Sequence, residues 1–480
     1  MVSRRSLFLG AAALGGSLGQ QPLPATAAQS ALDIGSRLEP LVDDFLIEKL
    51  TGGARHVMHS PESREIALDH NTPWEGNTCT YHTVFQDGDT YRMYYRGAHV
   101  DDATQKTTHD QVFCYAESTD GIHWTRPELG MHEFQGSRKN NICWVGPIGE
   151  HNFAPFRDRN PNAAPEMKYR AVGSGTQGFR GLFAFHSSDA IHWKQTRKDA
   201  IITDGAFDSL NLAFYDPHRK LYVDYHRKGR GGLRDIMTCT SLDFLNWTQP
   251  EFLEYGSAPK EHLYTNAITT YDRAPHILIG LPKRYVPNRN PSGHPQGGVS
   301  DCLLMTSRDG KNFRRSDGAF VRPGPEPSRW VNRNNLAAWG IVATRSNFPA
   351  APKELSIYTS EGYYRGPSCR LRRHSLRVDG FYSVQAPRGG GELVTRPFRF
   401  AGSDLILNYA TSAAGSIRVE VQDESGRALP RFALEQSPEI FGDEVEKRVR
   451  LGSGLAALTG QVIRLRFALS DADLYSLRFG

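Results

Sequence analysis

Short segments in which hydrophobic and polar residues alternate recur along most of the chain, and they occur in pairs. In the first pair, residues 80–96, a glycine-containing turn separates two stretches rich in β-branched and aromatic residues. Stretches of this composition favour β-strands, and the turn between them predicts a β-hairpin. Four similar hairpins are expected at residues 151–172, 210–227, 265–284 and 339–361. Helical periodicity is absent from the pattern.

A second signature follows each hairpin. Ser-Thr-Asp-Gly-Ile-His-Trp at residues 118–124 recurs four times in increasingly degenerate form, and its aspartates lie between 54 and 70 residues apart. That spacing fits a propeller blade of four strands. The aspartate accepts backbone N–H bonds within a tight turn, so we assign it a structural role, and the turn resembles the Asp-box of sialidase-like propellers. The aspartates are Asp120, Asp189, Asp243, Asp309 and Asp379.

These repeats predict an all-β fold. We expect a five-bladed β-propeller, the catalytic domain, over residues 38–386, with residues 38–66 closing the ring by pairing with the last blade. A Pro-Arg-Gly-Gly-Gly linker follows, and alternating segments after it predict a C-terminal β-sandwich domain over residues 389–480.

Residues 1–27 resemble a Tat-type signal peptide. They contain a twin arginine, a short apolar run and an Ala-Thr-Ala cleavage site. A membrane anchor is the alternative, but the run is short and rich in glycine, and no later segment is apolar enough to span a bilayer. We therefore predict a periplasmic or secreted protein without a membrane span.

Composition supports a globular protein and limits its partners. The 46 glycines and 28 prolines fit a fold with many tight turns. A net charge of +5 over 480 residues is too small to indicate nucleic-acid binding. The six cysteines include no C-x-x-C spacing, so we predict buried free thiols, with no metal site and no cofactor.

A polar column emerges when the first four hairpins are aligned on their turn aspartates. Buried amides need hydrogen-bond partners, so a column of this kind on the innermost strands predicts a polar, substrate-binding channel. Structural hydrogen bonds between blades are the alternative. The column consists of His82, Asn152, Asn211 and Asn266.

Three acids stand just upstream of this column, in blades one, three and four: Glu75, Asp208 and Glu261. Hydrolysis of a glycosidic bond uses two carboxyl groups, one protonated and one charged. A third carboxylate shifts the pKa of the acid by repulsion. We predict these three as catalytic, although each could be an ordinary surface acid.

Other polar and aromatic residues are expected around the same mouth. The arginines among them either pair with the acids or bind an anion of the substrate through their planar fork. These predicted substrate-binding residues are Trp74, Arg96, His151, Arg227, His262, Arg284 and Glu361.

The five-fold repeat, the Trp74-Glu75-Gly76-Asn77 opening and the rear sandwich resemble the superfamily of glycoside hydrolase families 32, 43 and 68. The similarity is greatest to exported family 32-like proteins. It implies a two-carboxylate mechanism on a carbohydrate. The W-M-N-D-P-N-G and E-C motifs of family 32 are not matched, since Glu261 precedes a histidine, so fructan specificity is not implied.

Three functions follow from these residues. The first is an exported glycoside hydrolase acting on a plant, algal or microbial oligosaccharide or polysaccharide, either neutral or anionic. The second is a polysaccharide lyase that uses His82, His262 or Tyr264, with arginines neutralising a uronate. The third is a carbohydrate-binding propeller without catalysis. Facing carboxylates about 5 Å apart would favour a retaining hydrolase, and about 6.5 to 9.5 Å an inverting one.

Overall fold

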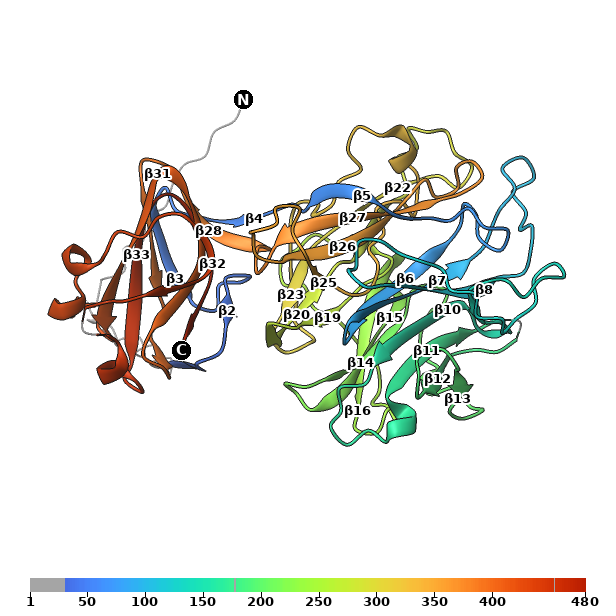
Figure 1. The fold of residues 1–480 in the computed structure, drawn as a ribbon, viewed down its shortest axis with the longest axis horizontal. Helices are drawn as coiled ribbons and strands as arrows, with labels where there is room; N and C mark the ends of the chain where they lie inside the picture. Colours follow the sequence, from blue (N-terminus) through green and yellow to red (C-terminus); the bar gives the residue numbers. More distant parts are fainter. Residues whose placement is uncertain (1–30, 177, 453) are drawn as a thin grey trace, which may run out of the picture.

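The computed structural model describes residues 31–176, 178–452 and 454–480. The predicted signal peptide, residues 1–27, lies outside the described residues. Nearly all regular structure is β-strand, gathered into a larger and a smaller lobe (Figure 1), so the described chain is all-β as predicted. No described helix is long or apolar enough to cross a membrane. The described helices are short 3-10 turns at Pro165–Met167, Pro327–Arg329, Pro430–Phe432, Leu434–Gln436 and Ala456–Leu458.

The larger lobe repeats one unit, an antiparallel sheet of four strands. Within the described residues five such sheets occur, and each predicted hairpin forms the first two strands of one sheet. We number these sheets in chain order and call the first strand of each the inner strand. The first sheet is β6 (Thr80–Asp87), β7 (Thr90–Gly97), β8 (Val112–Ser118) and β9 (Ile142–Trp144). The second is β10 (Ile148–Arg157), β11 (Tyr169–Gly175), β12 (Leu182–Ser187) and β13 (Lys194–Gln195).

The other three sheets continue the same order. The third is β14 (Leu212–Asp216), β15 (Leu221–Arg230), β16 (Leu233–Ser241) and β17 (Glu251–Phe252). The fourth is β19 (Thr269–Tyr271), β20 (Ala274–Gly280), β23 (Met305–Ser307) and β24 (Arg314–Arg315). The fifth is β25 (Val342–Thr344), β26 (Glu354–Glu361), β27 (Arg370–Arg377) and β5 (Glu62–Asp69).

The recurring aspartates hold the turns that follow the third strands. Asp120 Oδ1 accepts the backbone N–H groups of Ile122 and His123, both at 2.8 Å. Because the carboxylate is bonded within its own turn, the structural role predicted for it is confirmed. The same pair of bonds recurs at Asp189, Asp243 and Asp309.

The segment before the first sheet divides between the two lobes. Its last strand, β5, pairs with β27 and covers the outer edge of the fifth sheet, which is the closure predicted for this segment. The four strands before β5 pair instead with C-terminal strands, so residues 38–58 differ from the predicted propeller boundary. The reason is burial, because Leu41, Leu46 and Ile47 pack in the core of the smaller lobe. These strands are β1 (Leu32–Gly35), β2 (Glu39–Pro40), β3 (Ile47–Gly52) and β4 (Arg55–Met58).

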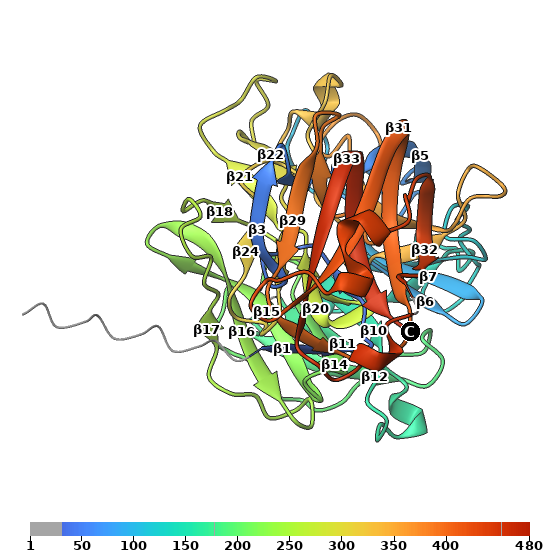
Figure 2. The same cartoon turned by 90° about the vertical axis from the view of Figure 1, so that its left-hand side faces the viewer.

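The smaller lobe is one hydrogen-bonded network of ten described strands, seen face-on in Figure 2. Its two long strands, β31 and β33, pair along most of their length, and Val419, Leu465 and Phe467 lie in its core. The predicted linker before residue 389 does not separate the lobes, because β28 already belongs to this network. The C-terminal strands are β28 (Tyr382–Ala386), β29 (Gly391–Thr395), β30 (Phe398–Phe400), β31 (Leu405–Asp423), β32 (Asp443–Val449) and β33 (Ile463–Phe479).

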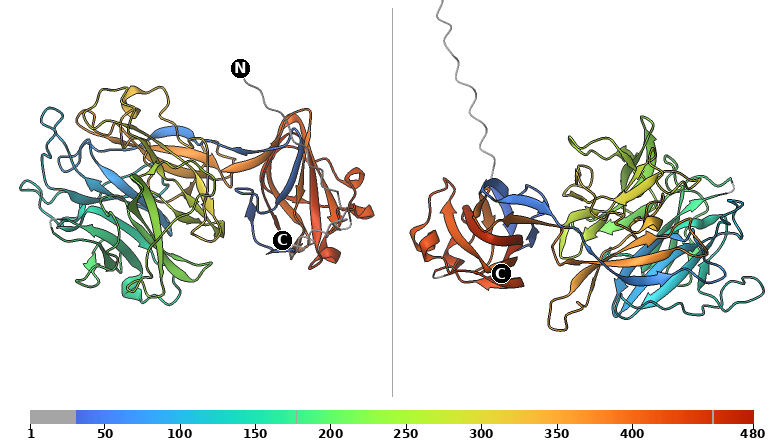
Figure 3. Two further views of the ribbon diagram at one scale, coloured as in Figure 1. Left: turned by 180° about the vertical axis from the view of Figure 1, so that it is seen from behind. Right: turned by 90° about the horizontal axis from the view of Figure 1, so that it is seen from above.

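The two lobes are joined by strands and by a buried carboxylate. The paired strands β4 and β28 run between the lobes (Figure 3). Asp379, the most degenerate copy of the turn aspartate, accepts hydrogen bonds from the Tyr271 hydroxyl at 2.5 Å and from Ser476 Oγ at 2.8 Å. Tyr271 belongs to the larger lobe and Ser476 to the smaller one, so this copy of the turn fastens the lobes together.

One small sheet beside the fourth sheet was not expected. The sequence pattern placed residues up to Arg284 on a single strand, but the strand β20 ends at Gly280 and the chain leaves the sheet at Pro282. Proline has no N–H for a sheet ladder, which explains the break. The new sheet consists of β18 (His262–Leu263), β21 (Lys283–Val286) and β22 (Val299–Cys302).

The six cysteines are all buried and free, as the sequence predicted.

Candidate functional site

Residues at the starts of several inner strands meet at one end of the larger lobe. The Tyr81 hydroxyl lies 2.8 Å from the Tyr264 hydroxyl, and Tyr264 donates to the Asp208 carbonyl oxygen at 3.0 Å. Asn211 Nδ2 donates to Asn152 Oδ1 at 3.2 Å. Four separate parts of the chain therefore form one site, and most predicted binding residues lie in it or beside it.

The predicted polar column lies inside the protein. Asn152 and Asn211 both donate to the Phe207 carbonyl oxygen, at 2.8 and 2.9 Å, and His82 Nε2 lies 3.0 Å from His70 Nε2. These bonds link side chains of neighbouring strands, as the structural alternative required, but His82 Nδ1 and Asn211 Oδ1 are buried without a hydrogen-bond partner among the described residues. All four members, His82, Asn152, Asn211 and Asn266, are at most 2% exposed.

Glu75 is an enclosed carboxylate. It accepts hydrogen bonds from the Tyr95 hydroxyl at 2.5 Å and from Arg126 Nε at 2.8 Å, and its side chain is 0% exposed. Burial raises the pKa of Glu75, but the His70 ring and the Arg126 guanidinium outweigh this effect and hold the pKa at about 2. A carboxyl group that is ionised and enclosed cannot give a proton to a leaving group, so Glu75 does not fit the acid role.

Asp208 and Glu261 lie in two different depressions. Asp208 has a 68% exposed side chain, pairs with Arg227, and lines a depression of about 490 Å³ together with His151. Glu261 pairs with Arg315 Nη2 at 2.9 Å and lines a separate depression of about 300 Å³. Within the described residues, no side chain hydrogen-bonded to Glu75 is also bonded to either of these acids.

Two further predicted residues are held in ion pairs. Arg284 forks onto Asp301, at 3.0 and 2.6 Å, and reaches Glu261 at 3.1 Å. Glu361 is buried and accepts from Arg372 Nε at 2.6 Å. For Arg284, the structure fits the alternative in which the arginine pairs with neighbouring acids and not with a substrate anion.

The three predicted aromatic binding residues have different surroundings. The Trp74 indole N–H donates to Asn141 Oδ1 at 2.7 Å. His262 Nδ1 accepts from the backbone N–H of Arg234 at 3.1 Å. His151 alone stands beside the meeting point of the inner strands, with its Nδ1 3.3 Å from an arginine nitrogen.

Four cations surround the ring of Tyr264. Lys283 Nζ lies 4.4 Å from the ring centroid, and the guanidinium carbon of Arg227 lies 5.0 Å from it. Those of Arg333 and Arg234 lie at 5.6 and 5.9 Å. Cations over a tyrosine face are attracted to its electron density, but four of them also repel one another.

Arg96 extends this group. Its Nη2 donates to the Tyr363 hydroxyl at 2.9 Å, and Arg333 Nη1 donates to the same oxygen at 3.2 Å. Its guanidinium carbon lies 4.9 Å from the centroid of the Tyr81 ring. We call Arg96, Arg227, Arg234, Lys283 and Arg333 the cationic cluster.

Positive charge in the cationic cluster exceeds negative charge. In the described part of the chain, Arg227 is the one member with a carboxylate within 4 Å, that of Asp208. Burial and the charges of the neighbouring arginines lower the pKa of Lys283 well below its usual value. Burial, followed by the charges of Arg96 and Arg333, lowers the pKa of His151 to about 3. A bound anion would relieve this repulsion.

The sequence reading missed Arg234, Lys283 and Arg333. Lys283 directly precedes Arg284, so an error of one residue hid it, whereas Arg333 lies outside any strand pattern. Tyr81 and Arg333 have positive φ angles of 57° and 69°. Left-handed backbone is uncommon for non-glycine residues and concentrates at functional sites.

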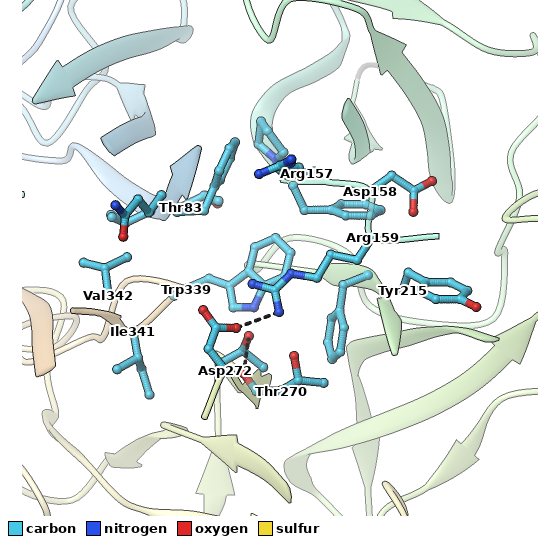
Figure 4. A pocket seen from close by; sticks show the side chains of 18 of the residues that line it. Thr83, Arg157, Asp158, Arg159, Tyr215, Thr270, Asp272, Trp339, Ile341 and Val342 are labelled. Carbon is cyan, nitrogen blue, oxygen red and sulfur yellow. Dashed lines mark hydrogen bonds and ion pairs between the residues drawn. The ribbon is translucent and has the colours of Figure 1, made fainter. Parts of the chain in front are cut away.

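A second cavity, of about 530 Å³, lies at the other end of the inner strands (Figure 4). The indole of Trp339 stands at the centre of this cavity. The backbone N–H of Trp339 donates to the His82 carbonyl oxygen at 2.8 Å. Arg159 pairs with Asp272 at 2.6 Å, and Arg157 has a carboxylate 3.6 Å away. The charges here are matched, unlike those of the cationic cluster.

Comparisons with known proteins give distant similarities. No family model matches the chain. Two curated proteins of Mycobacterium tuberculosis match over 173 residues: "Uncharacterized protein Rv1502" at 29% identity and "Uncharacterized protein MT1551" at 35%. Each match covers 35% of this chain and 51% of the relative, so the chain spans about half the length of these relatives.

Similar solved structures include a β-1,2-mannobiose phosphorylase from Listeria innocua, with a TM-score of 0.47 and 11% identity over 68% of this chain and 98% of that one. The catalytic domain of the Coprinopsis cinerea GH62 α-L-arabinofuranosidase has a TM-score of 0.43 and 12% identity, over 67% and 99% of the two chains.

Proposed function

We propose that this protein is an exported enzyme that cleaves glycosidic bonds in an anionic glycan. We further propose that its five four-stranded sheets are the blades of a propeller and that the ten-stranded network is a β-sandwich. The repeated hairpins, the repeated aspartate turns and the covering of the last sheet by β5 support this arrangement.

The excess of positive charge in the cationic cluster carries the functional proposal. Carboxylate and sulfate groups of acidic sugars accept paired hydrogen bonds from a planar guanidinium. Arg234 and Arg333 are partly exposed, and neither has a carboxylate partner among the described residues. A uronate or a sulfated sugar would supply the missing negative charge.

Hydrolysis is the first candidate reaction. Asp208 is the most exposed of the three predicted carboxylates and adjoins the cationic cluster through Arg227. We propose that it exchanges a proton with the glycosidic oxygen, as acid–base hydrolysis requires. The Tyr264 hydroxyl, bonded to the Asp208 carbonyl, is the second reacting group that we propose.

Elimination is a second candidate, favoured by Lys283. This amine is buried, its pKa is lowered, and it lies 4.4 Å from the Tyr264 ring centroid among arginines, so we propose it as the base of an elimination. A lyase removes the C5 proton of a uronate, breaks the C4–O bond and forms a C4–C5 double bond while cations neutralise the carboxylate.

A panel of anionic and neutral polysaccharides tests the proposal. New reducing ends report either reaction, and absorbance of an unsaturated uronate reports elimination alone. We expect cleavage of at least one uronate-containing or sulfated glycan by the purified protein, and slower cleavage at low glycan concentration in Arg333→Gln. Cleavage confined to neutral glycans, or equal activity in Arg333→Gln, would reject the anionic substrate.

A further inference from the structure

Three metal-binding types of side chain meet on one face of the third sheet. Asp224 and His226 are two residues apart on β15, so their side chains point to the same face. Cys239 on β16 is the direct cross-strand partner of Asp224. The antiparallel pairing therefore brings a carboxylate, an imidazole and a thiol together without any loop.

The ligand atoms of this trio lie close together. One atom from each of Asp224, His226 and Cys239 lies within 4.8 Å of the other two, and all three residues are buried. Asp224 Oδ1 lies 3.8 Å from Cys239 Sγ and contacts His226 Nδ1. In the described residues no other group of three or more histidine, cysteine or acidic side chains meets this geometry.

Two further observations point to a bound cation. Asp224 Oδ2 is buried and has no hydrogen-bond donor among the described residues, which is costly for a carboxylate. His226 Nε2 lies 2.9 Å from the Asp204 carbonyl oxygen. A metal bound at Nδ1 would replace the proton that His226 shares with Asp224 Oδ1, while the bond to Asp204 keeps a proton on Nε2, as in many metal sites.

We propose that Asp224, His226 and Cys239 bind a zinc ion. Zinc accepts oxygen, nitrogen and sulfur ligands together, at about 2.0 to 2.3 Å, whereas calcium and magnesium avoid sulfur. Three protein ligands and one water molecule complete a tetrahedron. Asp224 Oδ1 and His226 Nδ1 are in direct contact, so these two side chains would have to separate for an ion to lie between them.

This zinc ion would hold the segment that carries Asp208. His226 is bonded to Asp204, and its ring lies 5.3 Å from that of Phe207. Gly205 permits this close packing, because a Cβ there would meet Phe207 at 2.5 Å and His226 at 2.7 Å. The ion would therefore act as a positioning element for Asp208.

The test uses the full chain as purified, compared with Cys239→Ala. Elemental analysis is expected to find about one zinc ion per chain in the wild type and almost none in Cys239→Ala. Replacement by Co²⁺ is expected to give a thiolate-to-cobalt charge-transfer band in the wild type alone. Cys302→Ala is the matched control, because Cys302 is also buried and free, and this variant is expected to keep both signals.

A second measurement needs no variant, should Cys239→Ala fail to fold. Removal of metal from the wild type with a chelator is expected to lower Tm, and Zn²⁺ but not Mg²⁺ is expected to restore it. The proposal is overturned if the wild type holds less than about a tenth of an ion per chain and neither Zn²⁺ nor Co²⁺ changes Tm or absorbance. Asp224 and His226 would then be a hydrogen-bonded pair.

Discussion

Glu75 and the cationic cluster lie at the same end of the larger lobe, yet their charges are balanced in opposite ways. Around Glu75, one buried carboxylate meets Arg126, the Tyr95 hydroxyl and the His70 ring. In the cationic cluster, Asp208 is the single carboxylate within ion-pair distance in the described residues. Matched charges indicate a structural role, and unmatched charges indicate a place for a ligand.

The contrast also explains why the acids were the more misleading signal. Glu75 stands at the opening of the first predicted blade and has the residue type that glycosidases use. Its environment nevertheless makes it a permanent anion with no access for a substrate.

The largest effect is expected at the reacting groups that we propose. Asp208→Asn and Tyr264→Phe should each lower kcat by about 10²- to 10⁴-fold, because each removes a proton-transfer group. Steady-state kinetics on the glycan found in the panel measure this. Glu261→Gln, in the separate depression, is the control and should stay within a few-fold of the wild type. A loss in Glu261→Gln as large as in Asp208→Asn would contradict our assignment.

Glu75→Gln should affect folding more than turnover. Removing one partner of a buried ion pair costs up to about 3 to 5 kcal/mol, and here the partly buried Arg126 charge is left without its partner. Urea denaturation is expected to show this loss, while kcat of the folded variant stays within a few-fold of the wild type. Unchanged stability together with a collapse in kcat would restore the catalytic role predicted for Glu75.

The free energy of unfolding should fall as the medium becomes acidic. The pKa of His151 is lowered from 6.5 to about 3 and that of Glu75 from 4.5 to about 2, so both groups bind protons more readily in the unfolded chain. Their stabilisation is complete above about pH 6.5 and is lost as the pH falls towards these folded values. Urea titrations between about pH 7 and pH 4 measure the trend. A flat profile over this range would contradict the shift at His151, whose window between pH 6.5 and about 3 it largely covers.

Substitution of two arginines should distinguish an arginine that binds ligand from one that has a structural role. Arg333→Gln should weaken the binding of an anionic glycan by about 10- to 30-fold, because a charge-assisted hydrogen bond is lost. Arg284→Gln should change the affinity little, because Asp301 and Glu261 already occupy that guanidinium. Isothermal titration calorimetry distinguishes them. Equal losses of affinity in the two variants would contradict the distinction between arginines that are paired with acids and arginines that are not.

The sequence was most informative where structure is local. The hairpins follow from two-residue alternation, and the turns at Asp120 and its copies follow from bonds to backbone groups two and three residues away. The pairing of β1–β4 with C-terminal strands could not be read in this way. It depends on contacts across more than three hundred residues, such as Val384 with His56.

The sequence pattern could not separate the residues of the candidate site from their neighbours on the same strand. Neighbouring residues on a strand point to opposite faces, so an error of one position exchanges a structural residue for a functional one. Arg284 was chosen and Lys283 was missed for this reason, and likewise His82 was chosen over Tyr81. Whether a charge is matched depends on residues distant in sequence, as Glu75 and Arg126 show.

The central claim is that the cationic cluster binds an anionic sugar. The most direct measurement compares binding of one uronate glycan with that of its carboxyl-reduced, neutral form at low and moderate ionic strength. We predict that the wild type binds the anionic form at least about tenfold more tightly and that salt weakens this preference, because screened charges attract less. Equal affinity for the two forms, with no dependence on salt, would contradict the account.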